Sequence, residues 1–248
     1  MLQEVNFALP CPRANWALFL DLDGTLLDIA PHPDAVIVPD GLRESLAAAR
    51  AALGGGLAIV SGRAPAELDR ILAPLRLPAA AEHGAWLRRD DNDPWDATPL
   101  PAVPAAWHAH VEAAAEGHPG VIVEAKPLGL TVHLRQAPDA LPRFRALLAE
   151  LVAGAPDRFV LTDAKMGLEV RPRGADKGTA VLRLLEAAPF RGRMPVFLGD
   201  DTTDEDGFAV ARRLGGIAVR VVEPSTSPDR VRQWLQALPA RLTEASVA

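Results

Sequence analysis

The sequence predicts an α/β protein in which a parallel β-sheet carries helices on both faces and is interrupted by an inserted α+β domain. Short apolar segments alternate with amphipathic segments before residue 103 and again after residue 173, which is typical of a parallel sheet with right-handed crossovers. Between these positions the order changes to helix, two strands, helix, two strands, which is typical of an antiparallel α+β layer. We therefore expect a discontinuous parallel-sheet domain, 1–102 with 174–248, and an insert, 103–173.

The first part of the parallel-sheet domain opens on a strand, Trp16–Leu20, whose residues are all apolar. A helix over "GLRESLAAARAAL" follows and runs into glycines, which favour a helix C-terminus. The next strand is "LAIV", and the helix "APAELDRILAPL" carries Pro65 in its first turn, where proline is tolerated. The segment "PAAAEHGAWLRR" predicts a third strand, a turn and a returning hairpin arm.

The insert and the second part of the parallel-sheet domain are predicted by the same patterns. In the insert, the helices "AAWHAHVEAAAEGHPG" and "DALPRFRALLAELVAG" each precede a strand pair, "VIVEAKPLGLTVHLR" and "RFVLTDAKMGLEVRP". After the insert, the helix "DKGTAVLRLLEAA", the strand "PVFLGDD", the helix "DEDGFAVARRLGG" and the strand "IAVRVV" restore the first alternation. A last helix over "SPDRVRQWLQALPARL" completes it.

Composition limits the classes of partner. The net charge of -6 and the absence of a basic run argue against a nucleic-acid surface. No apolar run is long enough to span a bilayer, and the N-terminal residues show no signal-peptide pattern. The single cysteine, Cys11, cannot form an intrachain disulfide. We expect a cytoplasmic monomer that binds a small polar molecule or a metal ion, and neither nucleic acid nor membrane.

Polar residues follow the predicted strands at the point where each strand ends. Asp21 and Asp23 end the first strand, Ser61 follows the second, and the acidic stretch Gly199–Asp206 follows the strand "PVFL". Lys177 stands just ahead of a helix, whose first amides can hold an anion. Because ligands bind at the carboxyl ends of the strands in open parallel sheets, we expect these side chains to meet at one edge.

Each of these features has a structural explanation when it is taken alone. Asp23 can cap a turn or helix, Ser61 with Gly62 can form a turn, and Lys177 can be a solvated helix residue. The acidic stretch can cap the next helix, and its spacing does not match an EF-hand calcium loop. The occurrence of all four features at strand ends favours a shared site over four separate explanations.

The residue types suit phosphoryl transfer. Carboxylate oxygens are the ligands that Mg²⁺ prefers, and acidic side chains placed together repel one another unless a cation binds them. One carboxylate can act as a covalent nucleophile, and a second can do acid–base work. Ser61 and Lys177 can hold the transferring oxygens, whose charge must be stabilised.

The motifs "DLDGTL", "SGR", Lys177 and "GDD" resemble those of the haloacid dehalogenase (HAD) superfamily of phosphatases. Further segments, including "AEHGA", "VEAKPLGLTVHLRQAP" and "PVFLGDDTTDEDGFAVARRLGG", resemble the trehalose-6-phosphate phosphatase family along nearly the whole chain. The resemblance implies a Rossmann-like core with a cap formed by the insert, which closes over the sugar and excludes water. It also implies Mg²⁺-dependent hydrolysis of trehalose 6-phosphate through an aspartyl-phosphate, a step of trehalose biosynthesis.

The resemblance also implies roles for individual residues. Asp21 would be the nucleophile and Asp23 the acid–base residue, while Ser61 and Lys177 would grip the phosphoryl group. The expected metal ligands are Asp21, the Asp23 carbonyl and Asp200, with Asp204 acting through water and Asp201 beside them. The expected substrate-binding residues are Arg63, His83, Glu124, Lys126, His133, Lys165 and Glu169.

Some of these assignments have open alternatives. His133 can be a packed sheet histidine, Glu124 a surface charge, and His83 part of a structural turn. Family members often have glycine before the cap lysine, whereas Ala164 precedes Lys165 here. For the whole protein, the alternatives are a phosphatase for another sugar phosphate, such as sucrose phosphate, and a non-catalytic sugar-phosphate sensor.

Overall fold

The strand β1 (Trp16–Leu20) lies near the centre of a seven-stranded sheet, and all of its residues are buried. The sheet has the order β11-β10-β1-β2-β3-β4-β5. Its first five strands are parallel, and β4 returns antiparallel to β3 as the predicted hairpin arm. The other strands are β2 (Leu57–Val60), β3 (Ala79–Ala81), β4 (Trp86–Arg88), β5 (Asp96–Ala97), β10 (Met194–Gly199) and β11 (Ile217–Arg220).

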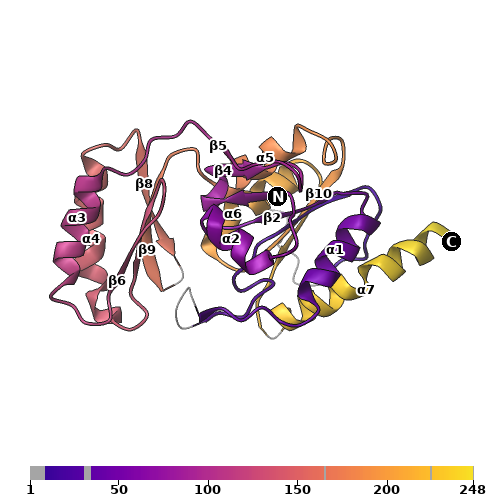
Figure 1. The fold of residues 1–248 in the computed structure, drawn as a ribbon, viewed down its shortest axis with the longest axis horizontal. Helices are drawn as coiled ribbons and strands as arrows, with labels where there is room; N and C mark the ends of the chain where they lie inside the picture. The colour runs from indigo at the N-terminus through magenta and orange to yellow at the C-terminus, as the bar shows by residue number, and fades with distance from the viewer. Residues whose placement is uncertain (1–8, 31–34, 165, 224, 248) are drawn as a thin grey trace. The chain divides into compact units, whose positions relative to one another are not determined.

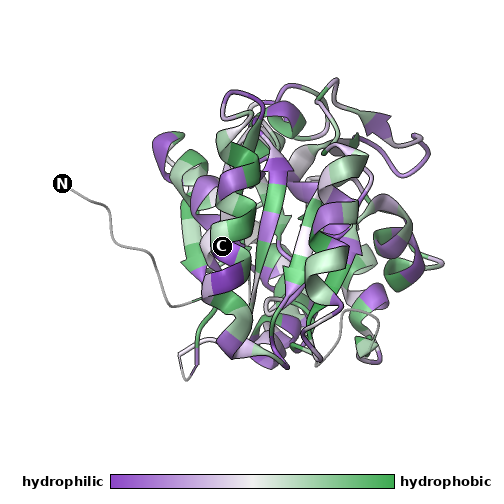
Figure 2. Ribbon diagram, turned by 90° about the vertical axis from the view of Figure 1, so that its left-hand side faces the viewer, coloured by the Kyte–Doolittle hydropathy of each residue, from purple (hydrophilic) through white to green (hydrophobic). Residues whose placement is uncertain are grey.

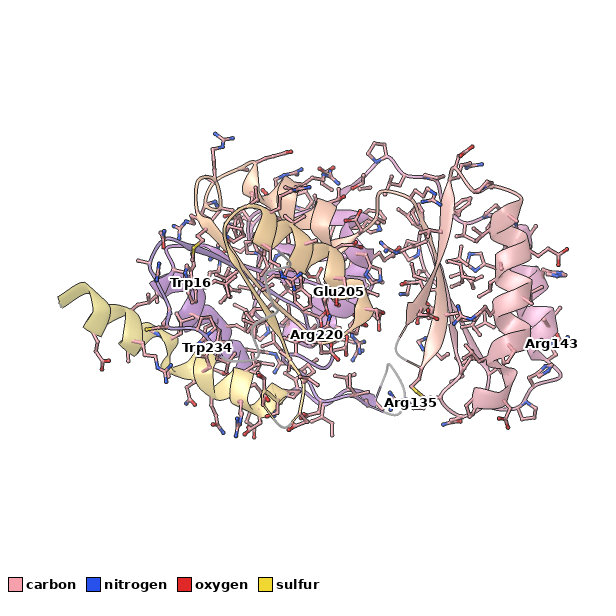
Figure 3. All side chains as sticks on the ribbon, turned by 180° about the vertical axis from the view of Figure 1, so that it is seen from behind. Trp16, Arg135, Arg143, Glu205, Arg220 and Trp234 are labelled. Carbon is pink, nitrogen blue, oxygen red and sulfur yellow. The ribbon has the colours of Figure 1, made fainter. Side chains whose placement is uncertain are left out.

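Helices cover both faces of this sheet because side chains alternate along β1. Trp16 and Leu20 belong to the apolar cluster formed with α1 (Leu42–Ala52), α2 (Pro65–Leu72) and α7 (Pro228–Val247). In that cluster Trp16 stacks on Trp234 of α7, with ring centroids 6.3 Å apart (Figure 3).

The neighbouring residues of β1 point to the opposite face. Ala17 and Phe19 pack with α5 (Lys177–Leu185) and α6 (Glu205–Arg213). The parallel sheet with helices on both faces, predicted from the sequence, is therefore confirmed.

The insert forms a separate four-stranded antiparallel sheet with the order β6-β7-β9-β8. Two helices, α3 and α4, lie side by side along it in Figure 1 and pack on it through one apolar cluster. In Figure 2, hydrophobic and hydrophilic residues form bands along helices and strands, as expected for elements buried on one side. The elements are α3 (Ala105–Ala115), β6 (Ile122–Ala125), β7 (Leu130–His133), α4 (Leu141–Ala153), β8 (Phe159–Ala164) and β9 (Gly167–Pro172).

The chain divides into two compact units, each with its own core. We call Met1–Asp96 with Asp176–Ala248 the core unit, and Ala97–Ala175 the insert unit. The insert expected from the sequence, 103–173, lies within the insert unit. The computed structural model describes residues 9–30, 35–164, 166–223 and 225–247. Within those ranges, no helix has the length and apolar character needed to cross a bilayer.

Candidate active site

Three carboxylates from two strand ends gather in the core unit. Asp21 follows β1, while Asp200 and Asp204 follow β10, and one carboxylate oxygen of each lies within 4.8 Å of the others. Lys177 Nζ donates to Asp21 Oδ1 at 2.7 Å and to Asp204 Oδ1 at 2.6 Å. Asp21, Lys177 and Asp204 are almost fully buried. We call Asp21, Lys177, Asp200 and Asp204 the carboxylate cluster.

Local structure fixes the lysine and the acidic loop. Asp176 caps α5 by accepting hydrogen bonds from the backbone N–H and the hydroxyl of Thr179, so Lys177 is the first residue of a capped helix. Asp204 Oδ2 accepts from the backbone N–H groups of Asp200 and Asp201, at 2.9 and 3.0 Å. The acidic loop is therefore folded around Asp204.

Arg220, at the end of β11, braces the same loop from outside. Its guanidinium donates to the carbonyl oxygens of Asp200 and Asp201, at 3.2 and 3.4 Å. It also pairs with Glu205 at the start of α6 (Figure 3). These contacts hold the backbone from which the Asp200 carboxylate extends.

Gly24 allows the two acidic segments to meet. Its φ of +89° lies in the left-handed region, which favours glycine. A Cβ at this position would also lie 2.2 Å from Asp200 Oδ2. The turn after Asp23 therefore needs glycine both for its backbone conformation and for the approach of Asp200.

Burial and crowding shift the pKa values in the carboxylate cluster. Burial raises the pKa of the Asp21 carboxyl well above its ordinary value; Lys177 opposes this rise and the nearby carboxylates add to it. Burial also raises the pKa of Asp204, against the charge of Lys177. Burial alone would lower the pKa of Lys177, but Asp204 and Asp21 outweigh it and hold that pKa well above its ordinary value.

The donor set fits a divalent cation. Three carboxylates lie around one ammonium, so the cluster carries an excess of negative charge in a buried place. A bound divalent cation would offset this excess, and all three side chains offer the oxygen ligands that Mg²⁺ and similar cations prefer. Asp201 points elsewhere: its Oδ1 accepts from the backbone N–H and hydroxyl of Thr203.

Asp23 pairs with Arg63. Arg63 Nε and Nη2 donate to the two oxygens of Asp23, at 2.6 and 2.8 Å. Ser61, which follows β2, is buried, and its Oγ accepts from the backbone N–H of Arg63 at 3.2 Å. The geometry thus gives the two aspartates of "DLD" different partners.

His83 packs directly against the loop after β2. It is buried, and its backbone N–H donates to the carbonyl of Ser61 at 3.0 Å. A Cβ on Gly62 would lie 2.7 Å from the imidazole, so the ring occupies the space beside that glycine. Glu82 and His83 have φ values of +44° and +57°, an unusual conformation for residues with side chains. Such backbone strain is concentrated at functional sites.

The polar residues expected in the insert share one face of its sheet. Glu124, Thr131 and Glu169 are cross-strand neighbours, and Leu130 and Val132 alternate with them toward the helices. We call this set, completed by Lys126 and His133, the polar row.

One ion pair and one short histidine–carboxylate contact organise the polar row. Lys126 Nζ donates to Glu169 Oε1 at 2.6 Å, with both side chains less than a tenth exposed. His133 Nε2 lies 2.6 Å from Glu124 Oε2. Lys165, also expected to bind substrate, lies outside the described residues.

Sequence reasoning missed three side chains that support these residues. Glu67 contacts Arg63, Arg220 braces the acidic loop, and Thr131 Oγ1 lies 3.5 Å from Glu169 Oε1. Arg220 could have been found, because it ends a strand beside β10 at the same edge of the sheet. Glu67 follows Arg63 by four residues, a helical spacing that favours an ion pair.

Comparison with known proteins places the chain in a family. The family described as trehalose-phosphatase matches residues 19–236. The trehalose-6-phosphate phosphatase of Escherichia coli (strain K12) is 40% identical over 243 residues, covering 93% of this chain and 89% of that one. A probable trehalose-phosphate phosphatase of Sinorhizobium fredii is 40% identical over 217 residues, covering 88% and 82%.

A solved structure agrees in fold. The C-terminal domain of the C. albicans trehalose-6-phosphate phosphatase superposes with a TM-score of 0.77 at 24% identity, covering 94% of this chain and 98% of that one. It supports the combination of a parallel-sheet core with an antiparallel insert. With a family match over most of its length and relatives at 40% identity, the chain belongs to the trehalose-phosphatase family.

Proposed function

We propose that the protein is a phosphoric monoester hydrolase that cleaves trehalose 6-phosphate to trehalose and phosphate through an aspartyl-phosphate on Asp21. The observation that carries this proposal is the buried carboxylate cluster, in which Lys177 contacts Asp21 and Asp204. The family to which the chain belongs supports the choice of substrate.

In the first half-reaction a carboxylate oxygen of Asp21 attacks phosphorus, and the bond between phosphorus and the sugar oxygen breaks. Asp23 donates a proton to the departing oxygen, so that an alcohol leaves rather than an alkoxide. Lys177 and the Ser61 hydroxyl hold the phosphoryl oxygens and stabilise their charge in the transition state.

In the second half-reaction water attacks the aspartyl-phosphate. Asp23, now ionised, accepts a proton from that water. The bond between phosphorus and the Asp21 oxygen breaks, and phosphate leaves with Asp21 and Asp23 restored to their starting states. Each aspartate is therefore used in both halves, with its own task.

We assign the metal to Asp21, Asp200 and Asp204, whose oxygens lie within 4.8 Å of one another, and the Asp23 carbonyl is a further ligand on the family pattern. When bound, Mg²⁺ would neutralise charge on the phosphoryl group and position it. Asp201 is the least suited of the expected ligands, since its Oδ1 already accepts two hydrogen bonds from Thr203.

We assign sugar recognition to the polar row. Sugar hydroxyls need both donors and acceptors, and the row offers the ammonium of Lys126 and the carboxylates of Glu169 and Glu124. The insert unit would act as a cap that closes over the sugar and excludes water. His83 would contact the substrate from the core unit.

The test is phosphate release from a panel of substrates, with Mg²⁺ and with EDTA. The panel holds trehalose 6-phosphate, sucrose 6-phosphate, glucose 6-phosphate and an aryl phosphate. We expect rapid release from trehalose 6-phosphate with Mg²⁺ and release close to background with EDTA. In thermal unfolding, Mg²⁺ at about 100 times its Kd should stabilise the protein by about 2.7 kcal/mol.

The other outcomes identify the alternatives. Brisk release from another sugar phosphate, with none from trehalose 6-phosphate, would keep the chemistry and overturn the substrate. No release from any compound, with saturable binding of a sugar phosphate in calorimetry, would identify a sensor and overturn the enzyme proposal. Full activity in EDTA would overturn the metal assignment.

A further inference from the structure

The guanidinium of Arg63 is directed at carboxylates on both of its edges. On one edge, Nε and Nη2 form a two-pronged pair with Asp23, at 2.6 and 2.8 Å. On the other, Nη1 donates to Glu67 Oε1 at 3.1 Å. The Arg63 side chain is only 9% exposed, whereas the side chains of Asp23 and Glu67 are 33% and 22% exposed, so the guanidinium is the buried member of both pairs. Two parallel hydrogen bonds fix the plane of a carboxylate, which one contact from a lysine cannot do.

The backbone and the helix that carry this pair are themselves held in place. The Arg63 N–H donates to Ser61 Oγ, and its carbonyl accepts from the Glu82 N–H at 2.9 Å. Glu67 lies in the first turn of α2, and its Oε2 accepts from the Ala64 N–H at 3.4 Å. Arg63 is thus braced between a rigid turn and a helix start, which is the arrangement expected of a support for another side chain.

We propose that Arg63, braced by Glu67, is a positioning residue that fixes the plane of the Asp23 carboxyl group for its two proton transfers, to the departing sugar oxygen in the first half-reaction and from the attacking water in the second. This inference rests on the proposed function, in which Asp23 is the acid–base residue. It differs from the role in substrate binding expected for Arg63 from the family pattern. Three of the five guanidinium N–H donors already point at Asp23 and Glu67, which favours orientation of Asp23 as the main task of Arg63.

The positioning role of Arg63 predicts different effects on substrates with different leaving groups. An alkyl phosphate releases a strongly basic sugar oxygen, which needs a proton as it departs. An aryl phosphate such as p-nitrophenyl phosphate releases a stable phenolate that does not. The ratio kcat/KM reports the steps up to the departure of the leaving group. If the Asp23 carboxyl group is no longer held in place, kcat/KM should therefore fall for the sugar phosphate and stay nearly unchanged for the aryl phosphate.

The experiment measures kcat/KM of Arg63→Gln on trehalose 6-phosphate and on p-nitrophenyl phosphate. We expect a loss of about 100-fold on the sugar phosphate and less than about 5-fold on the aryl phosphate. Inhibition by inorganic phosphate should stay within about 3-fold of wild type, because the proposal removes no phosphate contact. Equal losses on both substrates, with weaker phosphate inhibition, would show a phosphate ligand and overturn the proposal.

Two further variants keep the test decisive if Arg63→Gln folds poorly. Glu67→Gln should lower kcat/KM by about 5-fold on the sugar phosphate alone, because it loosens Arg63 without removing it. Arg63→Lys should recover only part of the loss, since an ammonium cannot make the two-pronged pair. Full recovery by lysine would show that charge alone matters and overturn the positioning role.

A matched control removes another partly buried arginine. Arg50 pairs with Asp90 and Asp91, and Arg50→Gln should change neither substrate's kcat/KM. If wild type fails on trehalose 6-phosphate, the proposed function fails, and the leaving-group comparison is then made with whichever sugar phosphate it hydrolyses. The two failures are therefore distinguishable.

Discussion

The carboxylate cluster of the core unit and the polar row of the insert unit both bring charged side chains together in buried or partly buried places, but their charges are balanced differently. In the cluster, three carboxylates surround one lysine. In the polar row, each acid has its own base, Lys126 with Glu169 and His133 with Glu124. An excess of negative charge favours the binding of a cation, whereas paired acids and bases offer hydrogen-bond donors and acceptors without a cation.

The two regions also differ in how the chain assembles them. The cluster joins residues far apart in sequence, such as Asp21 and Lys177, because the ends of parallel strands meet at one edge. The polar row joins cross-strand neighbours of one antiparallel sheet. The residues proposed for the chemistry are therefore brought together by the topology of the core unit, and those proposed for sugar recognition by the strand register of the insert unit.

The pKa shifts follow the same division. Burial and neighbouring carboxylates raise the pKa of Asp21 in the cluster. In the polar row, burial would raise the pKa of Glu124, but the hydrogen bond with His133 and the charge of Lys126 hold it below its ordinary value. A cation bound to the carboxylate cluster would therefore stabilise its ionised form, whereas the ionised form of Glu124 is already stabilised by side chains of the polar row.

The largest effect should come from Asp21→Asn. An amide is a poor nucleophile, so kcat should fall at least about 10⁴-fold on both sugar and aryl phosphates. Steady-state kinetics measures the loss, and circular dichroism with thermal unfolding checks that the fold is retained. Activity within about 100-fold of wild type on either substrate would contradict covalent catalysis by Asp21.

An intermediate effect should come from Lys126→Ala in the polar row. Loss of a sugar contact should raise KM for trehalose 6-phosphate about 10-fold or more, and change kcat/KM for an aryl phosphate less than about 2-fold. The change also breaks the buried ion pair between Lys126 and Glu169, at a cost of about 3 kcal/mol in unfolding free energy.

The control for that loss of stability is the double variant Lys126→Met with Glu169→Gln, which removes both charges. It should unfold closer to wild type than Lys126→Ala does, while its KM for the sugar phosphate stays high. Equal losses of kcat/KM on sugar and aryl phosphates would contradict a role of Lys126 in binding the sugar.

The smallest effect concerns the pH dependence of Glu124→Gln. Because the folded pKa of Glu124 lies below its ordinary value, its ionised form stabilises the protein above that value, about pH 4.3. This contribution disappears as pH falls through the folded pKa. The unfolding free energy of wild type should exceed that of the variant by about 0.5 kcal/mol at pH 5.5, and the gap should narrow as pH falls below about 4.3.

Urea denaturation at several pH values measures that gap. Thr162→Val, in the same cross-strand row, is a control that removes a polar group without changing a charge. Its difference from wild type should not depend on pH between 3 and 5.5. A gap for Glu124→Gln that widens toward low pH would contradict the sign of the shift.

The fold was predictable because its signals are local and repeated. The apolar run of β1 and the alternation around it predicted the parallel sheet, and the strand-end rule placed Asp21, Lys177 and Asp200 at one edge, where the structure brings them together. The direction of the Arg63 side chain could not be predicted in this way. Asp23, phosphate and Glu67 are all chemically acceptable partners for a guanidinium, and only the folded geometry selects among them.

The backbone at His83 was also beyond sequence reasoning. Glu82 and His83 both adopt a positive φ, but neither residue type predicts a left-handed conformation as strongly as glycine does. Their backbone N–H groups donate to the carbonyls of Arg63 and Ser61, which lie about twenty residues earlier in the chain. Tertiary contacts, rather than local preference, decide such positions.

The place where the chain leaves the insert unit has a consequence for how such enzymes diversify. The insert unit is one continuous segment that ends at Ala175, and Asp176, which caps the helix of Lys177, follows at once. A genetic exchange of Ala97–Ala175 would replace the whole polar row in a single event and leave every member of the carboxylate cluster in its original gene context. Such an exchange would change the residues proposed to recognise the sugar, and it would keep the cap of the Lys177 helix as long as the second junction lies before Asp176.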